Sequence, residues 1–224
     1  MAGRQLFDDW PELYDRWFDT PVGKEVLKYE VTLVLDLLRP VRGEKILDAG
    51  SGTGIFTREF LVREADVVGL DISWAMLRWA KAKNEAFSQK GVAADMALLP
   101  FADGVFDKTV SVTAMEFIED EKRAVAELFR VTRSRGIVVV ATLNSLSPWA
   151  IRRRENARQD QGSIFNRVFF RSPAQLLATA PVPGIVRTAV HFGKEDDPAE
   201  LDRIERAGQG RETGAFIAAR WEKP

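Results

Sequence analysis

The sequence contains no cysteine, and this absence excludes several kinds of chemistry. Without thiols the chain cannot form a disulfide, a thiolate zinc site, a cysteine nucleophile or a redox-active thiol pair. Its one histidine, His191, lies in a strand-like run near the C-terminus, where we expect an ordinary structural role rather than catalysis. We therefore predict no metal site, and the lack of cysteine fits a cytoplasmic protein.

An excess of basic charge and a long apolar run are missing as well. The 32 lysine and arginine residues face 33 acidic residues, so the formal net charge is -1. Binding to a phosphate backbone usually leaves a basic excess, and nucleic acid is therefore not an expected partner. Residues 1–10 lack the basic start and apolar run of a signal peptide, and no later stretch could span a bilayer. We expect no membrane span, and a monomer or homodimer.

The 224 residues are 46% hydrophobic, which is enough apolar material for one substantial core. We predict a single domain over residues 1–224, in which the pattern changes near Asn144 and again near Ser172. These changes divide the chain into an N-terminal helical cap (1–39), a ligand-binding core (40–144), an inserted lid (145–171) and a C-terminal part of the sheet (172–224).

Helical and strand-like patterns alternate along the chain. A helix is predicted from Thr20-Pro21 to Arg39-Pro40, with apolar residues at helical spacing between them. Strands are predicted at 45–49, 67–70, near Val92, 106–112, 137–140, 185–192 and 214–221. Helices are predicted at 54–64, from Ser73, at 120–132 and, briefly, after Ser172. This alternation predicts an α/β fold with a doubly wound, mostly parallel sheet covered on both faces.

A glycine-rich turn follows the first predicted strand. Its glycines fall at positions 50, 52 and 54, between the strand and the next helix, where backbone N–H groups can approach a ligand closely. A dinucleotide fingerprint would place its third glycine at position 55, which is Ile55, and the Gly-Lys-Ser/Thr of a Walker loop is absent. The turn is therefore typical of a nucleotide-like ligand but of neither of these two classes.

Acidic residues come at the ends of the next two strands. Asp71 ends the second strand, where a carboxylate can accept both hydrogen bonds of a ribose diol. Asp95 follows the third strand and can accept an adenine amino proton, while Met96 offers a backbone donor and an apolar surface for the ring. Because the carboxyl ends of parallel strands meet at one edge, these acids should converge with Asp48 of the glycine turn on one crevice.

At these residues the sequence resembles the class I S-adenosylmethionine-dependent methyltransferases (methyltransferase domain type 11). It is most similar to the small-molecule branch, which includes the ubiquinone and menaquinone methyltransferases. The resemblance covers residues 40–144, and its first motif corresponds to the run from Leu47 to Gly54. The ribose acid of the family corresponds to Asp71, and its adenine acid to Asp95, which stands before Leu99-Pro100-Phe101.

The resemblance implies S-adenosylmethionine as the cofactor and a place for each matched residue. The implied neighbours are Asp48, Gly50 and Gly52 for the methionine moiety, Ile72 and Met76 for the adenosine, and Thr113 to Ile118 for the sulfonium side. Ser51, in the same turn, is a further predicted cofactor-binding residue. It also implies a Rossmann-like, seven-stranded sheet with an antiparallel last strand, in agreement with the strand predicted at 214–221. From the residues alone, Asp48 can equally serve to hold the glycine turn through backbone hydrogen bonds.

Two residues are candidate catalytic groups. S-adenosylmethionine carries a charged leaving group, so alignment of the acceptor with the methyl carbon is the main requirement. An acidic or phenolate acceptor needs no general base. For a neutral alcohol or phenol, Glu116, just past the fourth strand, and Tyr14, in the N-terminal segment, could remove the proton. Glu116 can also be read simply as a polar loop residue beside the cofactor.

The predicted substrate contacts are Tyr14, Trp17, Asn144 and Trp149. Tyr14 and Trp17 have helical spacing and could instead pack the N-terminal segment on the core. Trp149, with the aromatic residues of 165–170, could floor an apolar pocket or belong to the core beneath a lid. Arg152–Arg154 favours a solvated helix face, with an anion site for an acidic substrate as the alternative.

Together these features predict a methyltransferase that uses S-adenosylmethionine to methylate a small, partly apolar metabolite by in-line displacement. The alternative is a protein that binds S-adenosylmethionine or S-adenosylhomocysteine without catalysis, as a sensor or partner subunit. A Rossmann-type oxidoreductase is disfavoured by Ile55. Methylation of RNA or protein is disfavoured by the near-neutral charge and by Thr113–Phe117, which stands in place of an Asn-Pro-Pro-Tyr or Asp-Pro-Pro-Tyr signature.

Overall fold

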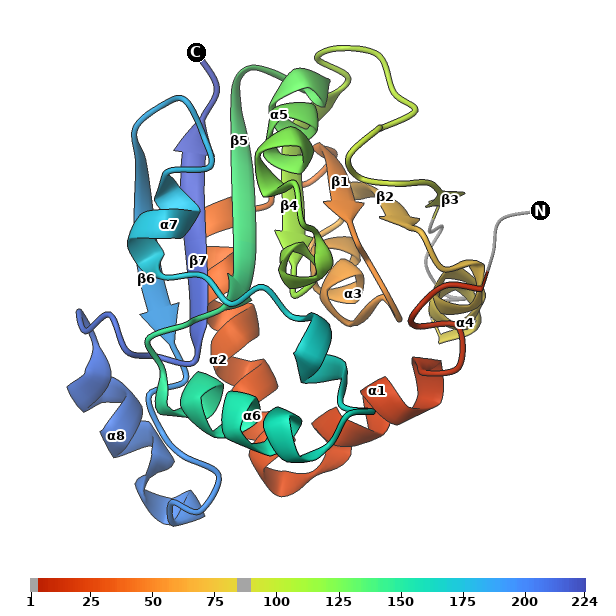
Figure 1. Ribbon diagram of the computed structural model, residues 1–224. Coiled ribbons are helices and arrows are strands. Elements are labelled where there is room, and N and C mark those ends of the chain that lie inside the picture. The colour runs from red at the N-terminus through yellow and green to blue at the C-terminus, as the bar shows by residue number, and fades with distance from the viewer. Residues whose placement is uncertain (1–3, 84–89) are drawn as a thin grey trace.

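A central sheet with helices on both faces organises the molecule, which is known from a computed structural model describing residues 4–83 and 90–224 (Figure 1). The strands are β1 (Lys45–Ala49), β2 (Asp66–Asp71), β3 (Lys90–Ala93), β4 (Phe106–Val112), β5 (Thr132–Leu143), β6 (Gly184–Ala189) and β7 (Phe216–Glu222). The α-helices are α1 (Pro11–Asp19), α2 (Pro21–Leu38), α3 (Ile55–Leu61), α4 (Trp74–Lys83), α5 (Glu121–Val131), α6 (Pro148–Gln159), α7 (Pro173–Leu177) and α8 (Leu201–Gly208). The 3-10 helices are η1 (Met115–Phe117), η2 (Ile164–Arg167) and η3 (Pro198–Glu200). The first three residues of the predicted N-terminal cap lie outside the described residues.

The sheet has seven strands in the order β3-β2-β1-β4-β5-β7-β6. Strands β1 to β5 pair in parallel, whereas β7 runs antiparallel to both β5 and β6. The predicted mostly parallel sheet with a reversed last strand is therefore confirmed. The carboxyl ends of the parallel strands meet at the lower edge in Figure 1, where α1 and α6 cross the molecule. Because the connections on this edge are loops, it is the place where an open α/β sheet binds ligands.

Each face of the sheet has its own hydrophobic core, because successive side chains of a strand point to opposite faces. In β1, Ile46 packs with α2 and α3 on one face, and Leu47 packs with α5 on the other. In β5, Val139 lies on the same face as Ile46, and Val138 lies on the same face as Leu47. Both faces are thus covered by helices, as the alternation of the sequence predicts.

Several element boundaries differ from the prediction. β5 is longer than the predicted 137–140, because it is paired along its length with β4 on one side and β7 on the other. α3 ends at Leu61 rather than near Glu64, whose backbone is left-handed (φ 59°) and accepts a hydrogen bond from the N–H of Gly43. The ends of β5 and α3 depend on strand pairing and on where the chain reverses direction, and a local sequence pattern does not contain this information.

Helix α8 was not predicted. Its buried residues are Leu201, Glu205 and Gly208, and one of these is charged, so the sequence shows no continuous apolar stripe. The Glu205 carboxylate instead accepts the backbone N–H groups of Val190 (2.9 Å) and His191 (2.7 Å), just beyond β6. In the segment 145–171 the structure forms α6 and η2; its role as a lid remains a prediction. Among residues 4–83 and 90–224, none of the helices combines the length and the apolar character needed to cross a membrane.

Candidate functional site

A cavity of about 440 Å³ lies at the carboxyl ends of β1, β2 and β4. Its wall is formed by the glycine turn after β1, the ends of β2 and β4, the loop after β3, and the N-terminal segment. The predicted cofactor residues that line it are Asp48, Gly50, Ser51, Gly52, Asp71, Ile72, Met76, Asp95, Met96 and Thr113. The fold thus brings all ten of them to one cavity, from parts of the chain that are far apart in sequence.

The glycine turn has the backbone conformation that its residues indicate. Gly50 has φ 78° and Gly52 has φ 53°, both in the left-handed region that favours glycine. A Cβ at Gly50 would lie 2.3 Å from the Cβ of Ala114 and 2.9 Å from Cε of Met96, so the turn packs against the end of β4. A Cβ at Gly52 would meet no atom within 4 Å, which means that this residue leaves room in the cavity itself.

Asp71 fixes the turn to the end of β2. Its Oδ2 accepts a hydrogen bond from the N–H of Gly52 (2.9 Å), and its Oδ1 accepts one from the N–H of Ser73 (2.8 Å). Burial raises the pKa of Asp71 above its ordinary value, and these backbone N–H groups partly oppose that shift. Each carboxylate oxygen has further acceptor capacity, so Asp71 can hold the turn and still accept the hydroxyls of a ribose.

Asp48 is buried at the end of β1 and lines the same cavity. Burial raises its pKa to about 7, although the Thr57 hydroxyl donates a hydrogen bond to Oδ2 at 2.6 Å and so favours the charged form. The backbone N–H groups of Gly50 and Ser51 donate to the carbonyl of Leu70 rather than to Asp48. Thr57 on α3 therefore orients the Asp48 carboxyl, while β2 holds the turn.

The loop after β3 supplies the third acid. Asp95 is exposed to solvent, and its Oδ1 accepts a hydrogen bond from the N–H of Ala97 (2.8 Å). The neighbouring Met96 is buried and lines the cavity. A carboxylate beside an apolar thioether suits an adenine, which has both a polar edge and an apolar face.

One buried polar atom in the cavity has no protein partner. Among the described residues, nothing forms a hydrogen bond with Oγ of Ser51, although this atom is buried and the residue lines the cavity. Buried hydroxyl groups are rarely left without a partner, so an orphan in a cavity wall points to a ligand. The open space at Gly52, the acceptors Asp71 and Asp95 and the free Ser51 hydroxyl together fit an adenosyl ligand with a polar tail.

The N-terminal segment closes one side of the cavity. Gln5, Leu6 and Phe7 line it, as does Tyr14 from α1. The segment is attached at two points: the Ser73 hydroxyl donates to Asp8 (2.8 Å), and Asp15 accepts three hydrogen bonds from the core. The donors to Asp15 are Thr53 Oγ1 (2.7 Å), Trp79 Nε1 (2.6 Å) and Lys83 Nζ (2.5 Å).

Tyr14 and Thr113 meet at the end of β4. Their side-chain oxygens lie 3.1 Å apart and share a hydrogen bond. Burial raises the pKa of Tyr14 far above its ordinary value, so the phenol keeps its proton at neutral pH. Thr113 has a left-handed backbone (φ 48°), a strained conformation for a β-branched residue, and strain of this kind concentrates at functional sites.

Glu116 is buried in η1, directly behind this wall, and does not itself line the cavity. Its Oε2 accepts a hydrogen bond from Oγ1 of Thr142 (2.9 Å). Burial raises the pKa of Glu116 to about 7, and the positive charges of Arg153 and Arg171 partly oppose this shift.

Three of the predicted substrate contacts lie outside the cavity wall. Trp17 packs against the core under α2. The amide of Asn144 donates to the backbone carbonyls of Glu212 (2.6 Å) and Gly214 (2.7 Å), so it joins β5 to the loop before β7. Trp149 is buried, and its Nε1 donates to the carbonyl of Phe192 (2.6 Å). The role of these three residues in substrate binding stays a prediction.

The sequence did not indicate several residues that line the cavity. Gln5, Leu6 and Phe7 precede the first helix and show no periodic pattern. Arg123 lies in the first turn of α5, where it reads as an ordinary surface residue. No cluster of three or more potential metal ligands is found in the part of the chain that the structure describes.

The central part of the chain matches a known protein family. Residues 47–140 match the family described as "Methyltransferase domain". A demethylmenaquinone methyltransferase of Renibacterium salmoninarum is 34% identical over 141 residues, which are 61% of this chain and 56% of that protein. A malonyl-[acyl-carrier protein] O-methyltransferase of Pectobacterium atrosepticum is 36% identical over 143 residues, 64% of this chain and 53% of that protein. The match thus spans about half the length of these relatives.

Solved structures share the fold over more of the chain. An S-adenosylmethionine-dependent methyltransferase of Thermotoga maritima, described as a possible histamine N-methyltransferase, has a TM-score of 0.78 and 23% identity, covering 97% of this chain and 98% of that one. A methyltransferase of Mesorhizobium loti has a TM-score of 0.65 and 22% identity, covering 86% and 96%. Residues 47–140 of this chain thus match a methyltransferase domain, and the chain shares its fold with these solved structures.

Proposed function

We propose that this protein transfers a methyl group from S-adenosylmethionine to a small, partly apolar acceptor. The observation that carries this proposal is the convergence of the glycine turn, Asp71, Asp95 and the unpartnered Ser51 hydroxyl on one cavity. Residues 1–224 would act as one unit, with 145–171 as a lid over the acceptor and the chain working as a monomer or homodimer.

Each part of the cavity suits one part of the cofactor. Asp71 would accept the ribose hydroxyls, with Ile72 and Met76 packed beside the adenosine. Asp95 and Met96 would hold the adenine. The methionine tail would lie along the turn, near Gly50, Gly52 and Asp48, where the Ser51 hydroxyl gains a partner. Thr113 would face the sulfonium.

When bound, S-adenosylmethionine supplies a methyl carbon that forms a bond to the acceptor atom as its bond to sulfur breaks and the electron pair stays on sulfur. The protein's own task is then mainly to hold the acceptor in line and to keep water out. Phe7, Tyr14, Phe117 and Ile118 give the cavity an apolar wall for this purpose.

For an acceptor that must lose a proton, we propose Glu116 as the general base. Its pKa of about 7 suits proton removal near neutrality. The charge of Glu116 acts on the Tyr14 hydroxyl, which lines the cavity, so this hydroxyl would pass the proton onward or hold the acceptor atom in place. With an acidic or phenolate acceptor, both residues would serve only in positioning.

The second candidate is a protein that binds the cofactor without transferring its methyl group. It is favoured by the hydrogen bonds of Asp8 and Asp15, which attach the N-terminal segment over the cavity. An enzyme must open this segment to exchange ligands, whereas a sensor could use its closure as the signal.

Calorimetry with S-adenosylmethionine and S-adenosylhomocysteine tests binding, and incubation of methyl-labelled cofactor with a metabolite extract tests transfer. We expect micromolar binding and a labelled small molecule. Asp71→Ala should weaken binding by about 30-fold to 1000-fold, because two hydrogen bonds to a carboxylate are worth about 2–4 kcal/mol together. Asp66→Ala, at the exposed start of the same strand, should have no effect. No binding at millimolar ligand would refute both candidates, and binding without transfer would favour the sensor.

A further inference from the structure

The segment 145–171, which forms α6 and η2, has a charge opposite in sign to that of the rest of the protein. It contains six arginines and two acids, a net charge of +4, within a chain whose formal net charge is -1. The remaining residues therefore sum to -5. α6 lies at the lower edge of the molecule in Figure 1, which is the edge that holds the cavity. A basic segment thus lies at this edge of an otherwise acidic molecule.

α6 turns one face to the core and the opposite face to solvent. Trp149, Ala150 and Ala157 are buried and mark the inner face. Ile151 and Arg158 are two turns apart on the outer face, and both are exposed, Ile151 to 53%. A large apolar side chain and a guanidinium therefore share the outer face of this helix.

Further arginines flank this outer face on both sides. Arg152 lies on one side, where it forms an ion pair with Glu195 (3.4 Å) that is open to solvent. Arg154 lies on the other side, and its guanidinium stacks over the ring of Phe170 (4.8 Å). Glu155 is the single acid of α6, so the outer side of the helix is basic.

The chain that follows α6 extends this basic and apolar surface. The amide of Asn166 donates to the carbonyl of Asp160 (2.9 Å) and so holds η2 beside the end of α6. Arg167 of η2 is exposed, and Phe169 is 45% exposed. In the part of the chain that the structure describes, the side chains of Arg158 and Arg167 form no ion pair or hydrogen bond. Both guanidinium groups are therefore free to bind an anionic partner.

The same segment is attached to the wall of the cavity. The N–H of Phe169 donates to the carbonyl of Glu116 (2.7 Å), and the Arg171 guanidinium donates to the carbonyl of Ile118 (2.9 Å). Ile118 and its neighbour Phe117 line the cavity. A partner bound to this surface would therefore lie close to the apolar wall of the cavity.

Exposed apolar side chains set among free arginines fit the surface of an anionic lipid bilayer. Such a bilayer offers negative head groups to the guanidinium groups, and apolar material just beneath them to Ile151 and Phe169. A protein interface usually has a contiguous apolar centre with a polar rim. Here the apolar side chains are instead interspersed with arginines, which favours the bilayer over an acidic protein.

We propose that Ile151, Arg154, Arg158, Arg167 and Phe169 form a docking surface for an anionic lipid bilayer. The arginines would bind the phosphate groups of the lipids, while the two apolar side chains enter the boundary between head groups and acyl chains. Docking goes beyond the proposed function and does not depend on it, because it requires neither cofactor nor acceptor.

Cosedimentation of the full chain with lipid vesicles tests this proposal. The vesicles consist of phosphatidylcholine alone, or of phosphatidylcholine with about one third of the anionic phosphatidylglycerol. We expect the affinity for the anionic vesicles to be tenfold or more higher, because each arginine at an anionic surface is worth about fivefold. Added salt should weaken this binding, since it screens exposed charges.

Two sets of variants show whether the docking surface causes the binding. Arg158→Gln combined with Arg167→Gln should lower the affinity for anionic vesicles by tenfold or more, and Ile151→Ser should lower it a few-fold. The matched control is Arg42→Gln combined with Arg63→Gln. It removes the same charge from the segments before β1 and β2, at the opposite edge of the sheet, and should bind as the unaltered chain does. Urea unfolding should show the same stability for the two double variants, since all four arginines are at the surface.

The result that supports the proposal is binding that depends on anionic lipid and that Arg158→Gln with Arg167→Gln weakens while the control does not. Equal affinity for neutral and anionic vesicles would overturn it, as would an equal loss in the two double variants. Binding to soluble polyglutamate as tight as that to anionic vesicles would also overturn it, in favour of an acidic protein partner. These outcomes leave the proposed methyl transfer untouched, because the vesicle experiment contains no cofactor.

Discussion

The carboxyl group of Glu30 makes stability depend on pH in a direction opposite to that of most surface acids. Burial raises its pKa from 4.5 to about 8, opposed by the charge of Arg153 and reinforced by Glu116. The folded protein therefore holds a proton that the unfolded chain releases as the pH rises above 4.5. The free energy of unfolding contributed by this group is fully present below the unfolded pKa and is lost as the pH rises through about 8.

Replacing the Glu30 carboxyl by an amide should remove this loss of stability at high pH. We expect Glu30→Gln to be more stable than the unaltered chain by about 2–4 kcal/mol at pH 9, with the difference shrinking toward zero near pH 5. Urea unfolding between pH 5 and pH 9 measures this difference, and Glu25→Gln, at a partly exposed position of the same helix, serves as the control. Parallel curves for Glu30→Gln and the unaltered chain would contradict the burial of an ionisable group at this position.

At the scale of elements, we expect the attachment of α1 to the core to control how the cavity opens. Asp15 joins α1 to the glycine turn through Thr53 and to α4 through Trp79 and Lys83. Since these bonds must break before a ligand can leave past α1, Asp15→Ala should speed the release of S-adenosylhomocysteine by about tenfold, as loss of roughly 1–2 kcal/mol from the closed state implies. Stopped-flow release measures the rate, and hydrogen exchange should rise over α1.

The control lies on the same helix. Glu12 pairs with Arg16 at the surface and touches no other element through that contact, so Glu12→Ala should leave release unchanged. Equal release rates for Asp15→Ala and Glu12→Ala would mean that α1 does not gate the cavity.

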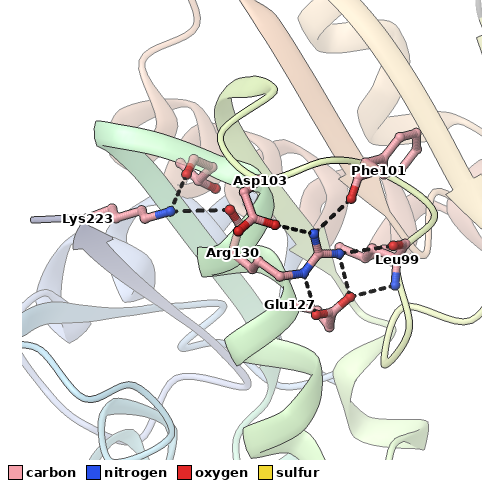
Figure 2. A network of polar contacts seen from close by, with 7 residues as sticks. Leu99, Phe101, Asp103, Glu127, Arg130 and Lys223 are labelled. Carbon is pink, nitrogen blue, oxygen red and sulfur yellow. Dashed lines mark hydrogen bonds and ion pairs between the residues drawn. The ribbon is translucent and has the colours of Figure 1, made fainter.

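The loop after β3 is held in a similar way by a single arginine. Figure 2 shows the Arg130 guanidinium, from α5, donating to the carbonyls of Leu99 (3.0 Å) and Phe101 (2.8 Å), and to Asp103 and Glu127. Glu127 in turn accepts the N–H of Leu99 (2.7 Å). This network fixes the loop just beyond Met96 and Ala97, which line the cavity.

Loss of this guanidinium should therefore weaken both the fold and the adenine side of the site. We expect Arg130→Met to lower the free energy of unfolding by about 2–3 kcal/mol, because two partly buried carbonyls and the Glu127 carboxylate lose their donor. Cofactor affinity should fall a few-fold through movement of the loop. Denaturant unfolding and calorimetry measure the two effects. Arg63→Met, which breaks only a surface pair with Glu59, should change neither, and the same loss in both variants would refute a specific role for Arg130.

For the whole molecule, ligand binding should appear as stability. A ligand at 100 times its dissociation constant adds about 2.7 kcal/mol to the folded state, which raises the Tm of a chain of this size by about 5–10 °C. We expect this shift with S-adenosylhomocysteine. In Gly52→Val the added Cβ would meet no atom within 4 Å and the side chain would extend into the cavity, so the variant should fold and lose the shift. Its Tm without ligand should be lower because of backbone strain. A full shift in Gly52→Val would place the ligand elsewhere, and Gly43→Val, a left-handed glycine distant from the cavity, controls for the strain.

The sequence pattern predicted the parallel part of the sheet well, because the signals for its strands and turns lie in short stretches of sequence. The strands at 45–49 and 106–112 are almost entirely buried, and the glycines at 50 and 52 mark the turn between strand and helix, so each of these segments has a local signal of its own. The acids Asp71 and Asp95 could be assigned to one site because the ends of parallel strands necessarily meet at one edge. Helix α8, by contrast, is held by the buried Glu205, which binds the backbone N–H groups of Val190 and His191 beyond β6. No apolar periodicity in the sequence predicts this helix.

The sequence by itself determined the doubly wound sheet, the glycine turn and the acids that line the cavity. These features depend on short-range patterns and on the meeting of parallel strand ends at one edge of the sheet. Only the tertiary structure decided which polar side chains are buried away from solvent. It buried Asn144 in backbone hydrogen bonds, lined the cavity with Gln5–Phe7, and buried Glu30 where the charge of the distant Glu116 acts on it. Desolvation depends on all the elements that pack around a group, and a single stretch of sequence contains only one of them.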